Sequence, residues 1–355
     1  MVNLVRNLCL AIVTGYLFSL CNVPLPWTLG PITGIALYSL TTGNAVHWPV
    51  KIRDIALILL GYAMGRPFTV QTGHAIIGQL PIMVGATLCT VLAGLLAGWY
   101  TYKKTGIPLL SCLLGCVPGG LSQMVILADE MEGNDATAVT IMQTLRMLSV
   151  VFVVPFLTMH VLPSPEAAGG MLPAETVPML SMENGWPFAL VAIAGAVLGK
   201  FLKLPTATLL GPILSTGAYI LYSGQTAPLV PLHYINMAQV CVGIYIGTSI
   251  NLAKIKEYHG LLSCLLKGVG FVLCISLFLG FMVAEITEAA FVTAFLSTAP
   301  GGLTEMGITA LLVGADISTM TAYQLVRLLF IMLFFPPLAK FLVARYESGK
   351  SVLHL

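Results

Sequence analysis

The sequence predicts an all-α polytopic membrane protein with two inverted repeats, each of about five transmembrane helices plus a Pro-Gly-Gly re-entrant hairpin. Composition, an internal repeat and the sidedness of the positive charges support this fold class. Of the 355 residues, 57% are hydrophobic and 8% are charged, and the mean hydropathy is +0.94. Soluble domains carry about 25% charged residues. The chain therefore lies far outside the soluble class.

The repeat is clearest at a Pro-Gly-Gly-Leu element. Pro118-Gly119-Gly120-Leu121 in the first half returns as Pro300-Gly301-Gly302-Leu303 in the second. One residue is lost after Met124 and Met306, and later matches keep a constant offset. These later pairs are Gly133 with Gly314, Asp135 with Asp316, Gln143 with Gln324, Arg146 with Arg327, and Pro155 with Pro336. A repeat that keeps such a break and an arginine inside apolar sequence is typical of a duplicated membrane transporter.

Several apolar runs have the length of a membrane span, which is about twenty residues for a bilayer core of roughly 30 Å. Examples are His74 to Tyr100, Leu261 to Val283 and Ser318 to Phe341. Leu4 to Leu20 could be a signal peptide, but no small-x-small cleavage pattern follows it, and its counterpart Trp186 to Lys200 lies mid-chain. We expect repeats over residues 1–160 and 184–343, an extracytoplasmic linker over 161–183 and a cytoplasmic tail over 344–355.

Lys and Arg accumulate in cytoplasmic loops, so they indicate orientation. In the first half, one loop holds Lys51 and Arg53, and its second-half counterpart, Ser223 to Tyr234, holds no Lys or Arg. Another first-half loop holds Lys103 and Lys104, and its counterpart, Ala284 to Glu288, again holds neither. The reverse holds for two other loops. Cys21 to Trp27 is uncharged, whereas its counterpart carries Lys200 and Lys203. Arg66 to His74 has one arginine, whereas its counterpart carries Lys254 and Lys256. Equivalent loops therefore lie on opposite sides of the membrane. That arrangement is an inverted repeat, which needs an odd number of spans per half.

Each half offers six apolar segments, so one should enter and leave on the same face. The Pro-Gly-Gly segment is the candidate, because it splits into pieces of about nine to eleven residues, too short to span. The pieces are Ile107 to Val117 and Leu121 to Asp129, and Ala289 to Ala299 and Leu303 to Val313. This gives ten spans and cytoplasmic termini. A broken helix that does span, giving twelve spans and a parallel duplication, stays open.

Backbone at a hairpin tip has lost its helical partners and is tolerated at membrane depth only beside protein or a water-filled cavity. The second arm begins with free N–H groups that suit an anion, and the first ends in carbonyls that suit a cation. The candidate binding residues here are Pro118, Gly119, Gly120, Ser122, Gln123, Pro300, Gly301, Gly302, Thr304 and Glu305. Glycine packing with a hydroxyl cap is the alternative.

The span after each hairpin carries a buried polar stripe. Counted from Ala136, Arg146 lies roughly 15 Å deep, near the midplane. Thr140, Gln143 and Arg146 share one side of the helix, and Thr321, Gln324 and Arg327 repeat them. An arginine at this depth should face the protein interior and have a partner. It either pairs with a carboxylate or hairpin carbonyls, or holds an anionic ligand, and the sequence leaves both readings open.

Glu305 breaks the symmetry, because its counterpart Gln123 cannot ionise. It could carry a coupling proton or sodium ion, or pair with an arginine. Other repeated elements are read as architecture: Gly61 with Gly65 returns as Gly243 with Gly247, a small-residue spacing that lets helices approach closely.

Composition and spacing argue against other classes of protein. The net charge of +2 is too small for nucleic-acid binding. Seven of the eight cysteines lie inside apolar runs and the six histidines lie at loops or span ends. We therefore expect no metal, no cofactor and no catalytic site.

Taken together, the paired Leu-Gly-Pro elements, the Pro-Gly-Gly elements with their Gly-x-Asp turns and the Gln-x-x-Arg pairs resemble the bacterial AbrB-type duplicated membrane proteins. The resemblance covers nearly the whole chain. Such proteins have been labelled ammonia monooxygenases and transcriptional regulators, and a member has been linked to regulation of gene expression. This sequence offers no metal cluster or DNA-binding segment for either label.

The leading expectation is a secondary transporter of the inner membrane that moves a small anionic solute by alternating access, with an indirect effect on gene expression compatible. The rivals are a non-transporting membrane sensor that affects gene expression and a membrane enzyme. The expected partners are the lipid bilayer and a small solute, and a homodimer is compatible with the architecture.

Overall fold

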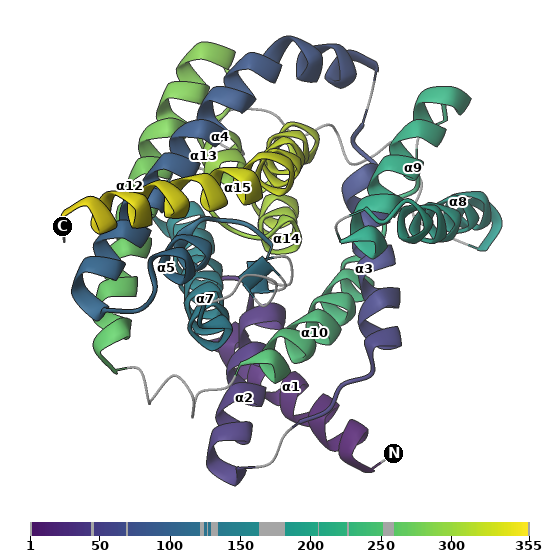
Figure 1. The fold of residues 1–355 in the computed structure, drawn as a ribbon. Helices are drawn as coiled ribbons and strands as arrows, with labels where there is room; N and C mark the ends of the chain where they lie inside the picture. Colours follow the sequence, from purple (N-terminus) through teal and green to yellow (C-terminus); the bar gives the residue numbers. More distant parts are fainter. Residues whose placement is uncertain are drawn as a thin grey trace. The chain divides into compact units, whose positions relative to one another are not determined.

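A computed structural model describes residues 2–43, 46–68, 70–120, 124–125, 127–128, 134–162, 182–204, 206–225, 227–250 and 259–353. These residues form thirteen helices and no strand (Figure 1). The helices are α1 (Val2–Leu20), α2 (Pro26–Thr42), α3 (Val50–Gly65), α4 (Val70–Thr105), α5 (Leu109–Cys116), α7 (Ala136–His160), α8 (Met182–Phe201), α9 (Ala207–Ser223), α10 (Leu232–Ser249), α12 (His259–Thr287), α13 (Phe291–Thr298), α14 (Leu303–Val313) and α15 (Ile317–Leu353). The prediction of an all-α protein is confirmed over this part of the chain.

Five of these helices are long and apolar enough to cross a membrane. They contain the stretches Asn3–Leu20, Ile76–Thr105, Ala136–His160, Leu261–Thr287 and Ile317–Ala339. The pieces on either side of the second Pro-Gly-Gly element are much shorter, at 8 residues for α13 and 11 for α14. At about 1.5 Å per residue, neither could cross a bilayer alone.

Several predicted loops were too long. Lys51 and Arg53 lie in the first turn of α3, and Lys103 and Lys104 lie in the last turn of α4. Helix α12 continues to Thr287, and α4 already begins at Val70. The loop limits followed the first charged residue, whereas a helix can continue past it. A lysine in a last turn also complements the negative end of the helix dipole.

The helices group into two compact units, and each unit takes segments from both halves of the sequence. The first unit comprises residues 1–77, 155–252 and 307–319. The second comprises residues 78–154, 253–306 and 320–355. The grouping concerns contacts in space, and the repeat boundaries drawn along the sequence stay a prediction.

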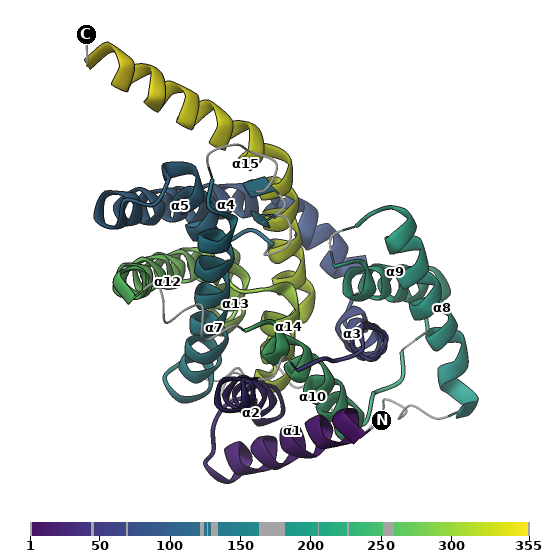
Figure 2. The ribbon, with the colours of Figure 1, turned by 60° about the horizontal axis from the view of Figure 1, so that its bottom comes forward.

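Close helix approaches build the first unit. Helix α1 packs on α2 and α8 on α9, and the latter pair lies side by side in both views (Figure 1 and Figure 2). A methyl group added at Gly30 would lie 2.5 Å from Gly15 Cα, and one added at Gly211 would lie 2.2 Å from the Gly195 carbonyl oxygen. Only glycine permits both approaches.

The Gly-x-x-x-Gly pairs make the contacts between the two sequence halves in this unit. A methyl group at Gly61 of α3 would lie 2.5 Å from the Leu209 carbonyl oxygen of α9. At the equivalent Gly243 of α10 it would lie 2.7 Å from the Thr28 carbonyl oxygen of α2. The architectural reading of these glycines is confirmed, because each helix rests directly on the backbone of its neighbour.

The same backbone turns recur in both halves. Leu25 before α2 has φ 50° and Thr206 before α9 has φ 47°, a left-handed conformation that is unusual for such side chains. Gly43 and Gly224 end these two helices with φ 65° and 66°. The sequence repeat is therefore also a repeat of local structure.

The second unit holds the two breaks in the chain. Its core includes Leu114 and Val117 at the end of α5, packed with Val91 of α4, Val139 of α7 and Phe335 of α15. Thr298 at the end of α13 donates a hydrogen bond of 2.8 Å to the Ser276 carbonyl of α12. Both short helices thus end inside packed protein.

Candidate functional site

The first break begins where α5 ends. Val117 is extended at φ −71° and ψ 134°, and the Gly119 N–H turns back to the Val117 carbonyl at 2.8 Å. The last four carbonyls of any α-helix lack partners within the helix. In apolar surroundings they need other donors.

Two side chains from α7 supply those donors (the two helices are neighbours in Figure 1). Gln143 Nε2 donates to the Leu114 carbonyl at 2.6 Å and to the Val117 carbonyl at 3.1 Å. Arg146 Nη1 donates to the same Val117 carbonyl at 2.6 Å, and Nη2 to the Gly119 carbonyl at 3.3 Å. A Gln-x-x-Arg pair on one helix face therefore caps the end of α5.

The second break repeats this arrangement. Gln324 Nε2 of α15 donates to the Leu296 carbonyl at 2.8 Å and to the Ala299 carbonyl at 3.3 Å. Arg327 Nη1 donates to the Ala299 carbonyl at 2.5 Å, and Nη2 to the Gly301 carbonyl at 2.7 Å. Here Arg327 also donates to Gln324 Oε1.

The two caps are not identical. Gln143 Oε1 and Arg146 Nε are buried without a hydrogen-bond partner among the described residues. The equivalent Gln324 Oε1 is satisfied by Arg327. The first cap therefore retains hydrogen-bonding capacity that the second has used.

The buried charges of the described part of the chain all lie at these breaks. Arg146 is 9% exposed, Arg327 5% and Glu305 8%. Among the described residues neither guanidinium forms an ion pair with a carboxylate. Burying charge is costly, so its concentration here marks a specialised region of the second unit.

One small cavity adjoins each arginine. The cavity beside Arg146 is lined mainly by apolar side chains and also by Pro300 of the second break. The cavity beside Arg327 is lined by Thr87, Thr90, Ser297, Thr298 and Tyr323, together with Met83 and Ala86. Each has a volume of about 10 Å³, roughly enough for one water-sized group.

The sequence-predicted site residues lie as follows. The non-helical segments consist of Pro118, Gly119 and Gly120 in the first break and Pro300, Gly301 and Gly302 in the second. The side chains that cap the two breaks are Gln143 and Arg146, and Gln324 and Arg327. Thr304 and Glu305 lie in the first turn of α14. Ser122 and Gln123 lie outside the described residues. The contact of both arginines with the break carbonyls was one of two open readings, and their binding of a ligand stays a prediction.

Sequence reasoning missed the hydroxyl-bearing residues beside Arg327. Thr87 and Thr90 come from α4, in the other half of the sequence, and nothing local connects them with Arg327. Aligning the halves residue by residue would have shown a signal, because valines stand at the matching positions in α12.

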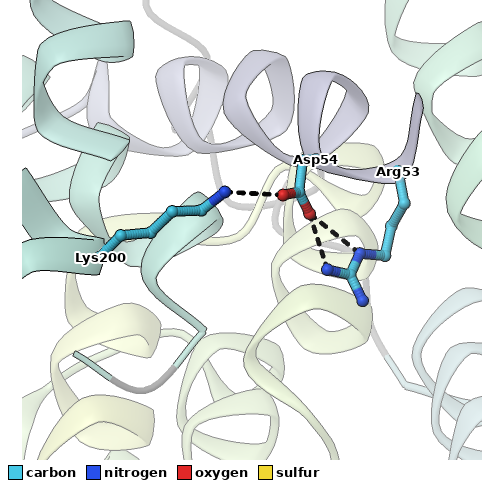
Figure 3. Close-up of polar contacts among 3 residues, drawn as sticks. All are labelled: Arg53, Asp54 and Lys200. Atoms are coloured by element: carbon cyan, nitrogen blue, oxygen red, sulfur yellow. Dashed lines mark hydrogen bonds and ion pairs between the residues drawn. The ribbon is translucent and has the colours of Figure 1, made fainter. Parts of the chain in front are cut away.

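A second charged cluster lies in the first unit. Asp54 at the start of α3 accepts hydrogen bonds from Lys200 Nζ of α8 at 2.8 Å and from Arg53 Nη2 at 2.7 Å (Figure 3). The Arg53 guanidinium also lies 4.3 Å from the centre of the Tyr245 ring of α10. The Lys200 side chain is 58% exposed. This cluster joins the start of α3 to the end of α8 and holds no enclosed charge.

The described residues contain no group of three or more His, Cys, Asp or Glu side chains placed to hold a metal ion.

Known proteins resemble this chain over nearly its full length. Residues 27–343 match the family described as transition state regulatory protein AbrB. The chain is 28% identical to the Escherichia coli (strain K12) protein named "Putative regulator AbrB", over 94% of each chain. It is 25% identical to the "Uncharacterized protein YhjN" of Bacillus subtilis (strain 168), covering 96% of this chain and 94% of that protein. Because the family match spans most of the sequence, and the paired breaks with their Gln-x-x-Arg caps lie inside it, the chain belongs to the AbrB family.

Proposed function

We propose that this protein is a secondary transporter of the inner membrane that moves a small anionic solute by alternating access. One observation carries the proposal: the buried charges of the described residues gather where two short helices break off in a Pro-Gly-Gly segment. Broken helices that meet at depth are a common way to build a binding site in duplicated transporters. The site would comprise the two breaks with Gln143, Arg146, Gln324 and Arg327.

The charge balance favours an anionic solute. Two buried arginines stand against one buried glutamate in the described residues. Part of each positive charge offsets the negative carbonyl ends of α5 and α13. The start of α14 adds the positive end of a helix dipole beside the second break. Glu305 in that first turn is the candidate for coupling to a proton or a sodium ion.

Contacts within the first unit favour the inverted repeat. The start of α3 meets the end of α8 through Asp54 and Lys200. The end of α3 meets the loop after α9, where Arg66 Nε donates to the Ala227 carbonyl at 2.9 Å. An inverted duplication puts each of these pairs on one membrane face. A parallel duplication with twelve spans would put the start of α3 and the end of α8 on opposite faces.

The short helices favour re-entrant hairpins over spanning broken helices. Helix α5 is 8 residues long, which corresponds to roughly 12 Å. Five spans per half then place both termini in the cytoplasm and the linker outside. On this proposal the protein is not an enzyme and needs no cofactor, its partners are lipid and solute, and pairing into a homodimer is compatible.

A membrane sensor is the second candidate, because one relative carries a regulator's name. A sensor would bind the same anion without moving it. Flux therefore separates the two functions, and an effect of transport on gene expression would be indirect.

The test begins with purified protein and a thermal-shift screen of small carboxylates, amino acids and inorganic anions, with and without sodium and at two pH values. A ligand that binds the folded state raises its melting temperature. The stabilising anion is then offered to proteoliposomes. We expect wild type to take up this anion. Uptake should be lost in Arg146→Ala and Arg327→Ala and retained in Lys103→Ala, a control at an exposed lysine. Normal uptake by both folded arginine variants would refute the site, and binding without uptake would favour the sensor.

A further inference from the structure

The cavities beside the two arginines are built from matching positions of the two sequence halves. Each of the eight residues that line the cavity beside Arg327 has its repeat counterpart in the lining of the cavity beside Arg146. The matched pairs that differ in polarity are Thr87 with Val269, Thr90 with Val272, Ser297 with Gly115, Thr298 with Cys116, and Tyr323 with Met142. In every one of these pairs the hydroxyl lies on the Arg327 side.

We infer that the cavity beside Arg327 is a binding site for a small oxyanion and that its counterpart beside Arg146, which lacks these five hydroxyls, does not bind one. This inference rests on the proposed function and deepens it, because it assigns the bound anion to the break at Arg327 and leaves Arg146 as the cap that holds the other break in the shape transport needs. The ligand class is the carboxylate of a small organic acid or an inorganic oxyanion of similar size.

The available hydrogen-bond donors identify the ligand class. Tyr323 is 3% exposed, and its hydroxyl has no hydrogen-bond partner among the described residues. An unpaired buried hydroxyl destabilises the folded protein, so a ligand oxygen that accepts its hydrogen bond would remove that penalty. Arg327 supplies the positive charge that selects an anion and disfavours a metal cation.

Two of the remaining hydroxyls are held in place but can turn. Thr90 Oγ1 donates to the Ala86 carbonyl at 2.8 Å, and Ser297 Oγ to the Thr293 carbonyl at 2.7 Å. These hydrogen bonds to their own helices fix the side-chain oxygen beside the cavity. A hydroxyl hydrogen can rotate toward a ligand, so the same oxygen can donate when an anion arrives.

The geometry also limits the size of the ligand. The cavity of about 10 Å³ holds one water-sized group in this conformation. A carboxylate or nitrate would place one oxygen there and leave the rest of the molecule toward the break. Acetate and nitrate are therefore the probes, with phosphate as the larger comparison.

The apolar copy provides matched controls. Thr87→Val removes a hydroxyl from the proposed site at constant shape, and Val269→Thr adds one at the equivalent position of the other cavity. Tyr323→Phe removes the unpaired hydroxyl and keeps the ring, whereas Met142→Leu changes its counterpart. Binding of acetate and nitrate is measured by titration calorimetry on full-length protein in nanodiscs, with each variant's melting temperature recorded without ligand.

The inference predicts that Thr87→Val and Tyr323→Phe weaken binding about tenfold to a hundredfold, the effect of losing a hydrogen bond to a charged group. Val269→Thr and Met142→Leu should change it less than threefold. If Tyr323→Phe does not fold, Thr90→Val serves in its place. Equal losses of affinity from substitutions in the two cavities, or unchanged affinity in the Thr87 and Tyr323 variants, would overturn the inference. Absence of binding by folded wild type, or binding of phosphate above both probes, would also overturn it.

The outcome is separable from that of the proposed function. If the variants bind with the predicted asymmetry but proteoliposomes show no uptake, the binding site is supported and transport is refuted. If uptake is unchanged in the Thr87 and Tyr323 variants, transport is supported and this binding site is refuted.

Discussion

The breaks after α5 and α13 share their backbone chemistry and differ in the side chains around it. In both, a glutamine and an arginine three residues later donate to carbonyls of the preceding short helix. This shared arrangement is required wherever a helix ends away from water, because its last carbonyls then need other hydrogen-bond donors. Of the five hydroxyls beside Arg327, that of Thr298 joins α13 to α12, and the other four are not required in this way. The comparison separates what holds the fold from what would recognise a ligand.

Removal of an arginine should give the largest loss of stability. Arg327→Ala leaves the Ala299 and Gly301 carbonyls without their donor and should destabilise the protein by about 2–4 kcal/mol. Arg146→Ala should cost less, because its second bond is longer, at 3.3 Å. Thermal unfolding in detergent measures both. Arg→Lys at each site is the control, and a larger loss for Arg146→Ala would contradict the comparison.

Glycines in the shared scaffold should show effects that are equal between the halves. Gly61→Ala and Gly243→Ala place a methyl group 2.5 Å and 2.7 Å from a carbonyl oxygen, so each should lose roughly 1–3 kcal/mol. The control is Gly85→Ala in α4, where nothing lies within 4 Å. Comparable melting temperatures for Gly61→Ala and Gly85→Ala would show that the α3–α9 contact is wrong.

The glutamine caps should show a smaller and unequal effect. Gln324→Leu removes two hydrogen bonds to carbonyls and the acceptor for Arg327, whereas Gln143→Leu removes only bonds to carbonyls. The expected losses are about 2 kcal/mol and about 1 kcal/mol. Unfolding of the two variants side by side gives the ratio, and identical losses would remove the distinction between the caps.

The charged cluster at Asp54 should give the smallest effect. Its lysine is largely exposed, and exposed ion pairs contribute about 0–1 kcal/mol. Asp54→Asn should therefore shift unfolding by less than 1 kcal/mol, with a shift that shrinks further in high salt. A loss as large as that of Gln324→Leu would mean that the α3–α8 contact is more enclosed than its exposure indicates.

The all-helical fold and the buried arginines could be predicted because their causes are local. Apolar runs, Pro-Gly-Gly breaks and the spacing of Gln143 and Arg146 are visible in short windows of sequence. The ends of the helices could not be predicted, because Lys103 and Ala284 look like loop residues until the whole helix is seen. The polar cavity was also missed, since it joins Thr87 to Tyr323, which are distant in sequence.

Counterflow in proteoliposomes distinguishes a carrier from a sensor, because a carrier exchanges a solute across the membrane and a sensor does not. Vesicles are loaded with the unlabelled anion that stabilises wild type and are placed in a trace of the same anion in labelled form. We expect transient accumulation of label by wild type and Val269→Thr, and a strong reduction in Tyr323→Phe. Saturable binding without accumulation by correctly folded wild type would contradict the transporter, and accumulation unaffected by Tyr323→Phe would contradict the site.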